Sequence, residues 1–121
     1  MKVLNPFLDG DGVWQGDSPG TMRKRFQCIG AQNSMDFCAN VTVYPPGEGS
    51  VYHNHPQSDE LGYVISGSGV LQDMEKNVTA HLNQGDILLV DRGEIHRIFN
   101  NGTAPLLLLF VCISRTPMPE G

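Results

Sequence analysis

The chain has 121 residues, 40% of them hydrophobic and 17% charged, and a formal net charge of -5. This length suits a single compact domain, and the acidic balance, with no basic run longer than residues 23–25, excludes a nucleic-acid partner and a general attraction to anionic membranes. The longest apolar run, residues 106–113, is much shorter than the roughly 20 residues that a membrane-spanning helix needs.

Residues 1–21 are rich in turn formers and predict an irregular N-terminal arm with one short strand at residues 13–15. Phe7 and Trp14 are the apolar anchors expected to attach this arm to the body of the protein or to a second subunit. The first residues lack the apolar core of a secretion signal, which predicts a cytoplasmic protein.

Strand-length apolar runs separated by turn formers begin at Arg23 and define one barrel domain over residues 22–114, followed by a polar tail at residues 115–121. The predicted strands fall within residues 23–32, 36–46, 50–56, 60–73, 78–102 and 106–114. Glycine-containing turns divide the longer segments at residues 67–69, 84–86 and 92–94. No helical periodicity competes over more than one turn, so the chain is predicted to be all-β, a sandwich or a barrel.

Three cysteines, Cys28, Cys38 and Cys112, form an odd set without CxxC spacing. Each lies in an apolar strand pattern, which favours small buried side chains in a reducing compartment. A reactive thiol at one of these positions is the alternative.

Two histidines, His53 and His55, stand one residue apart, so on a strand they project from one face with their Cα atoms about 7 Å apart. Glu60 follows after Pro56 and three turn formers, so the chain can reverse and bring this carboxylate beside the imidazoles. A fourth metal ligand would come from another strand, where His96 is the candidate. The alternative is a solvated or packed histidine pair. The remaining histidine, His81, is expected to be a surface residue.

The spacing of these residues resembles the two motifs of the cupin superfamily. The first motif is matched by Gly47, His53, His55, Glu60 and Gly67, and the second by Gly85, Gly93, His96 and Asn100, with Asp91 where the family usually has proline. The resemblance covers residues 47–100 and implies a small single-domain cupin, a double-stranded β-helix with a jelly-roll β-barrel. It also implies one bound metal ion, with His53, His55, Glu60 and His96 as the ligands.

Three imidazoles and one carboxylate suit one divalent transition metal ion, and ligand type alone does not choose between the metals. Four protein ligands would close a tetrahedral zinc site, whereas a six-coordinate ion keeps two positions for water or substrate. This favours Fe, Mn or Ni, with Zn as a substitute in purified protein.

Such a site predicts a mononuclear metal-dependent enzyme, an isomerase, lyase, cyclase or dioxygenase, acting on a small oxygenated metabolite that chelates the metal. The alternative is a non-catalytic cupin that binds or senses an organic acid. No catalytic residue can be named from the sequence. Arg25 is expected to bind a substrate carboxylate and Tyr44 to donate a hydrogen bond, with a solvated arginine and a packed tyrosine as the alternatives.

Two further expectations concern shape. Some lyases of the superfamily carry a tyrosine two residues after the ligand glutamate, and this chain has Gly62 there, which argues against that reaction and predicts space near the ion. The strand within residues 106–114 is apolar on both faces, and a homodimer that covers one of them is the expected assembly.

Overall fold

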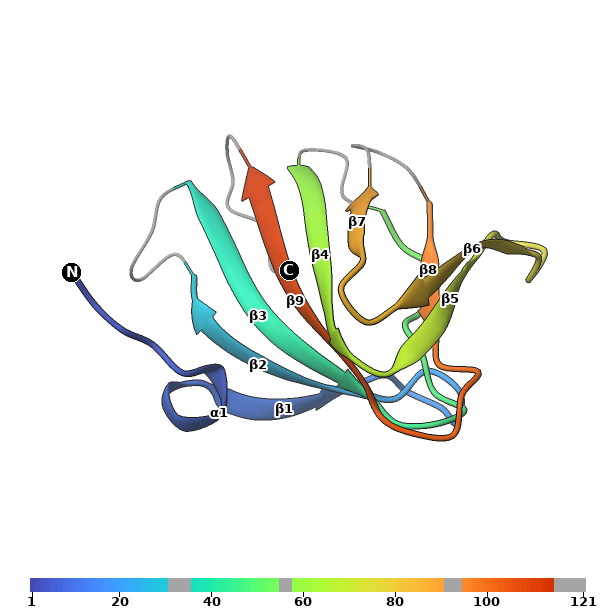
Figure 1. The fold of residues 1–121 in the computed structure, drawn as a ribbon, viewed down its shortest axis with the longest axis horizontal. Helices are drawn as coiled ribbons and strands as arrows, with labels where there is room; N and C mark the ends of the chain where they lie inside the picture. The colour runs from blue at the N-terminus through green and yellow to red at the C-terminus, as the bar shows by residue number, and fades with distance from the viewer. Residues whose placement is uncertain (31–35, 55–57, 91–94, 115–121) are drawn as a thin grey trace.

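The computed structural model describes residues 1–30, 36–54, 58–90 and 95–114. Within these ranges the chain forms nine antiparallel strands and one short helix (Figure 1). The elements are α1 (Pro6–Asp9), β1 (Asp11–Gln15), β2 (Arg23–Ile29), β3 (Phe37–Tyr44), β4 (Ser58–Ser66), β5 (Ser68–Gln72), β6 (Val78–Asn83), β7 (Ile87–Val90), β8 (Arg97–Phe99) and β9 (Leu106–Ser114). No described helix has the length and apolar character needed to cross a membrane. The predicted tail at residues 115–121 lies outside the described residues.

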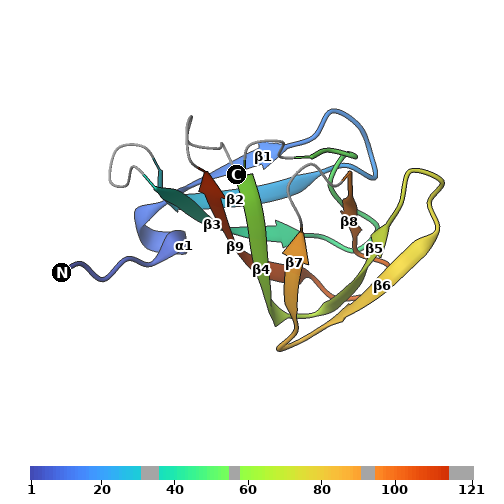
Figure 2. The same ribbon diagram turned by 90° about the horizontal axis from the view of Figure 1, so that it is seen from above.

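Six strands form one sheet in the order β1-β2-β3-β9-β4-β7, and three form a second sheet in the order β6-β5-β8. The chain crosses between the sheets at the bend between β4 and β5 and again at the turn between β6 and β7. Figure 2 shows the two sheets meeting at these connections and opening away from them. The all-β, double-stranded β-helix prediction is confirmed.

A strand is predicted over residues 50–56, and the described part of this range, residues 50–54, does not form one. Among the described residues of this segment, His53 makes one isolated bridge, with His96, and the Ser50 N–H donates to the carbonyl of Ile98 at 2.9 Å. Two prolines precede the segment and Pro56 interrupts it, and proline cannot donate to a strand ladder. The chain therefore follows β8 only loosely here, and this places His53 directly opposite His96.

The core lies between the two sheets and is built by alternation along the strands. In β9, Leu106, Leu108, Phe110 and Cys112 face inward and are buried, whereas Leu107, Leu109 and Val111 are half-buried on the opposite face. The apolar cluster also contains Tyr44, Val64, Leu82, Leu88, Val90 and Ile98. Both faces of β9 are therefore apolar, as predicted.

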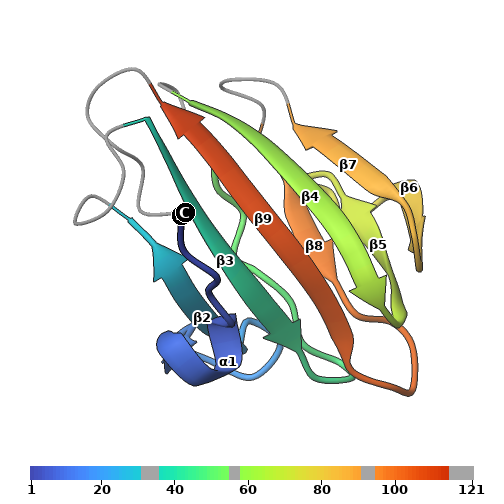
Figure 3. The same cartoon turned by 60° about the vertical axis from the view of Figure 1, so that its left-hand side comes forward.

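The N-terminal arm is more regular than predicted. The short strand expected at residues 13–15 extends over Asp11–Gln15 and pairs with β2, and it becomes the edge of the large sheet (Figure 1). Figure 3 shows β3, β9 and β4 side by side in the middle of this sheet. Helix α1, which was not predicted, begins after Asn5, whose side chain accepts a hydrogen bond from the Phe7 N–H. The Phe7 ring contacts the Phe26 ring at 4.9 Å, so Phe7 attaches the arm to the body of its own chain.

Asn100, the last residue of the second motif, holds the turn after β8. Its buried amide donates to the carbonyls of Tyr44 and Ala104, both at 2.9 Å, and accepts from the Gly102 N–H at 2.9 Å. One side chain thus ties the end of β3 to the loop before β9, which is a structural role.

Candidate metal centre

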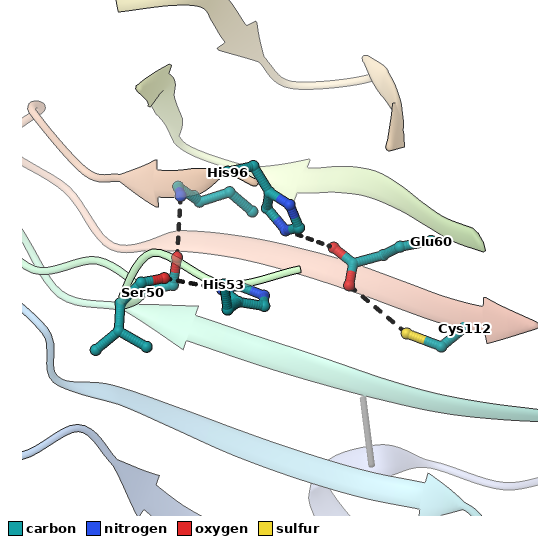
Figure 4. A network of polar contacts seen from close by, with 7 residues as sticks. Ser50, His53, Glu60, His96 and Cys112 are labelled. Carbon is teal, nitrogen blue, oxygen red and sulfur yellow. Dashed lines mark hydrogen bonds and ion pairs between the residues drawn. The ribbon is translucent and has the colours of Figure 1, made fainter. Parts of the chain in front are cut away.

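Three of the four predicted ligands lie together between the sheets. One donor atom from each of His53, Glu60 and His96 lies within 4.8 Å of the other two. The three side chains come from the segment before β4, from β4 and from the residue just before β8, and they point toward one another (Figure 4). The fourth predicted ligand, His55, lies outside the described residues.

The His53–His96 bridge sets the two imidazoles side by side. Each residue donates its N–H to the other's carbonyl, at 3.1 and 3.0 Å, and the ring centroids are 4.3 Å apart. The Nδ1 atom of His53 lies 2.8 Å from the Val51 carbonyl, which favours the tautomer that donates from Nδ1. In that tautomer Nε2 carries the lone pair, so His53 is oriented to bind through Nε2.

The third donor, Glu60, is only 4% exposed, and its Oε1 atom lies 3.7 Å from His96 Nε2. Two donors bound to one ion at about 2.1 Å lie roughly 3–3.5 Å apart, so this pair needs only a small inward shift. A buried carboxylate together with two imidazoles is a donor set that divalent transition metals bind in proteins. The described residues fit the predicted ion.

A cysteine supports this carboxylate, and the sequence did not predict the contact. The Cys112 thiol donates to Glu60 Oε2 at 3.6 Å, because the two residues are directly opposite in the β4–β9 ladder. Cys38 is opposite Cys112 on the other side, in β3. A hydrogen bond with Cys38, together with burial, raises the pKa of the Cys112 thiol, which therefore stays protonated as a donor to Glu60.

The side chains next to Glu60 on β4 face the directions that strand alternation predicts. Leu61 and Tyr63, which alternate with Glu60, point away from the core and are 37% and 42% exposed. His81 is exposed on β6 in the smaller sheet, as predicted, and is not part of the cluster. It provides a matched control for the buried histidines.

A small cavity of about 30 Å³ adjoins His53 and Glu60. Its lining consists of Gln15, Arg23, Arg25, Asn40, Thr42, Tyr44, Ser50, His53, Glu60, Ile98 and Phe110. Arg25 and Tyr44, the two predicted substrate-binding residues, are both among them. Arg25 donates to the Gln27 side chain, and Arg23 Nη1 donates to the Thr21 carbonyl at 3.3 Å. Arg23 and Arg25 thus contribute two positive charges to the lining of the cavity that His53 and Glu60 also line.

Tyr44 is buried with its ring in the core. Burial raises the pKa of its phenol; Arg23 lowers that pKa, Glu60 raises it and Arg25 lowers it, all by smaller amounts. The hydroxyl therefore remains protonated at neutral pH and can donate a hydrogen bond to a ligand in the cavity.

The expectation that Gly62 leaves open space near the ion is wrong. A Cβ atom at Gly62 would lie 3.1 Å from Phe110 Cε1 and 3.3 Å from Cδ1, so the Phe110 ring fills the place of the missing side chain. Phe110 is directly opposite Gly62 in the β4–β9 ladder. This contact could have been predicted only from the pairing of β4 with β9, which the sequence pattern does not specify.

Comparisons with known proteins agree with this architecture. The family model described as "Cupin domain" matches residues 40–112. The tetracenomycin polyketide synthase protein TcmJ of Streptomyces glaucescens is 39% identical over 75 residues, which cover 62% of this chain and 49% of that protein. The oxalate-binding protein of Thermotoga maritima is 38% identical over 69 residues, which cover 57% of this chain and 55% of that protein.

This chain therefore spans about half the length of the curated relatives that it matches. Among solved structures, that of a predicted oxalate decarboxylase from Thermotoga maritima superimposes with a TM-score of 0.79 at 24% identity, over 94% of this chain and 100% of that one. At this level of identity the likeness concerns the fold.

Proposed function

Because the chain belongs to the cupin domain family, we propose that it is a metal-dependent enzyme that acts on a small metabolite carrying a carboxylate. The observation that carries this proposal is the cluster of His53, Glu60 and His96 beside a cavity that His53 and Glu60 line together with Arg23 and Arg25. One divalent ion, with Fe, Mn or Ni favoured over Zn, would be held by these three residues and by His55.

When bound, such an ion supplies Lewis acidity to an oxygen of the metabolite. The chain's own residues bind and orient the rest of the molecule. Arg23 and Arg25 would bind the carboxylate, because a guanidinium matches its two oxygens in geometry and charge. The protonated Tyr44 hydroxyl would donate to another oxygen, and the apolar residues Ile98 and Phe110 would exclude water.

The size of the cavity supports a small substrate. About 30 Å³ is room for one or two water molecules, so the described residues enclose only a few atoms beside the ligands. A second candidate function is non-catalytic binding or sensing of an organic acid. The oxalate-binding relative favours this second candidate.

The test is to load the protein with Fe(II) or Mn(II) and to add oxalate and a panel of 2-oxo acids, hydroxy acids and diketones, while heat, oxygen uptake and products are measured. Oxygen consumption with product would support a dioxygenase, and turnover without oxygen an isomerase, lyase or cyclase. Binding without turnover would support the second candidate. If no carboxylate binds or reacts, both proposals fail.

A variant locates the carboxylate site. Arg25→Met should weaken oxalate binding at least about tenfold, because it removes a charged hydrogen-bond donor from the cavity wall, while the metal content stays the same. Lys76→Met is the matched control, since it removes one positive charge from an exposed turn outside the cavity. Equal affinities of the two variants would contradict the role of Arg25.

We also propose a homodimer, formed through the outer face of the large sheet. On β4 and β7 this face exposes a group of large apolar side chains, Leu61, Tyr63, Ile65, Ile87 and Leu89. Soluble monomers rarely expose contiguous apolar patches of this kind. Analytical ultracentrifugation should give a dimer that Leu89→Lys converts to monomer, and a monomeric wild-type protein would contradict the proposal.

We also propose that the protein is cytoplasmic. Cys28, Cys38 and Cys112 are not joined in a disulfide, and a reducing compartment maintains cysteines in this form. Detection of the chain outside the cytoplasm by cell fractionation would contradict it.

A further inference from the structure

One buried polar group in the cavity has no role in the cluster or in the fold described so far. Asn40 lies on β3 with 2% of its surface exposed, and it lines the cavity beside the predicted ligands. Its Oδ1 atom accepts a hydrogen bond from the Thr42 hydroxyl at 2.6 Å. Among the described residues, none accepts a hydrogen bond from its Nδ2 atom. The sequence motifs did not single out this residue.

Thr42 decides which way the amide faces. Asn40 and Thr42 are two residues apart on one strand, so both side chains point into the cavity. Because the hydroxyl donates to Oδ1, the amide nitrogen is turned to the remaining side. Because Asn40 lines the cavity, a bound molecule that supplies an acceptor for this amide gains a hydrogen bond.

The strand register places this amide across the cavity from the ligand carboxylate. Glu60, Cys112 and Cys38 are opposite one another across β4, β9 and β3, and Gly62, Phe110 and Asn40 form the next inward-facing row. Asn40 is therefore two strands and one row from Glu60, which corresponds to roughly 12 Å between Cα atoms.

Both side chains extend into the space between these strands, and the Phe110 ring lies over Gly62, on the β4 side. A molecule of a few atoms can thus bind the proposed metal ion at one end and accept a hydrogen bond from the Asn40 amide at the other.

We propose that the Asn40 carboxamide, oriented by Thr42, donates a hydrogen bond to a second oxygen of the metabolite. The site thereby selects dicarboxylates and oxo acids over simple monocarboxylates, which present an apolar group at that position. This inference rests on the proposed function, since it names the substrate class of the same site. Asn40 acts here as a specificity-determining residue.

The test compares two ligands in two proteins. Metal-loaded wild type and Asn40→Ala are titrated by calorimetry with oxalate and with acetate, in which a methyl group replaces the second carboxylate. Asn40→Ala should weaken oxalate binding about tenfold or more and change acetate binding less than about twofold. Asn101→Ala, which changes an exposed asparagine, is the matched control and should leave both affinities unchanged.

Two further measurements keep the test decisive. Asn40→Asp preserves the shape of the side chain if the alanine variant does not fold, and it should lose oxalate binding more strongly because it places a carboxylate against an anion. The side-chain amide resonances of Asn40 should move when oxalate, but not acetate, is added to the wild-type protein.

Two negative results have different meanings. Equal oxalate affinity in wild type and a folded, metal-loaded Asn40 variant would overturn the role of Asn40 and leave the proposed function standing. If the metal-loaded wild type binds neither oxalate nor acetate, this inference fails; if it also neither binds nor turns over any other carboxylate of the panel, the proposed function fails as well.

Discussion

Protein that carries His96→Ala should be purified almost without metal. His96 is 4% exposed and stands beside both other described donors, so its imidazole cannot be replaced by a neighbour in the cluster. Loss of an outer-shell partner alone weakens metal binding 10- to 100-fold, and loss of a direct ligand should weaken it at least about 100-fold. Elemental analysis of protein purified without added metal should show less than about 0.1 ion per chain.

The control is His81→Ala. This exposed histidine of β6 is not part of the cluster, so its replacement should leave the metal content at the wild-type value. The backbone bridge between His53 and His96 does not depend on either ring, so thermal denaturation should show that His96→Ala still folds. Equal metal content in the two variants would remove His96 from the ligand set.

Gly67→Ala should be more destabilising than alanine at Gly47 or Gly85, the other motif glycines that the structure describes. Gly67 has a φ of +83°, and a Cβ atom there would lie 2.3 Å from the Pro105 carbonyl oxygen and 2.9 Å from the Leu106 Cα. The left-handed conformation costs about 1–2 kcal/mol for a residue with a Cβ, and the collision with backbone adds about 1–3 kcal/mol. Urea denaturation should therefore show a loss of about 2–5 kcal/mol in the free energy of unfolding.

Gly85→Ala separates these two costs. Gly85 has a φ of +89°, but no atom lies within 4 Å of the place where its Cβ would be. The variant should lose only the conformational part, about 1–2 kcal/mol. If the two variants are equally stable, the close approach of the Gly67 backbone to the loop before β9 does not contribute to the stability of the fold.

Local pattern explains which parts of the structure were predictable. The alternation in β9 and the glycine turns at residues 67–69 and 84–86 are properties of neighbouring residues, and each appears in the structure. The segment at residues 50–56 also looks like a strand by local pattern. It forms only a bridge in its described part, because whether a strand forms depends on the partner that its backbone meets.

In the N-terminal arm, local sequence pattern predicts less regular structure than forms. Phe7 was predicted as an anchor from its apolar character, which a single residue carries. That the arm contributes helix α1 and an edge strand to the large sheet depends on its pairing with β2. The residues of the arm have weak secondary-structure propensities, and the pairing of β1 with β2 outweighs them.

The sequence by itself determined the fold family, the turns and the choice of candidate ligands, of which His53, Glu60 and His96 are described, since these depend on residue type and on spacing along the chain. Only the tertiary structure decided that Cys112 supports Glu60, that Phe110 fills the space over Gly62, and that Asn40 faces the same cavity. Each of these contacts requires the register of β9 against β3 and β4, which are far from it in sequence. A shift of β9 by one residue in that register would turn Cys112 and Phe110 to the other face of the sheet.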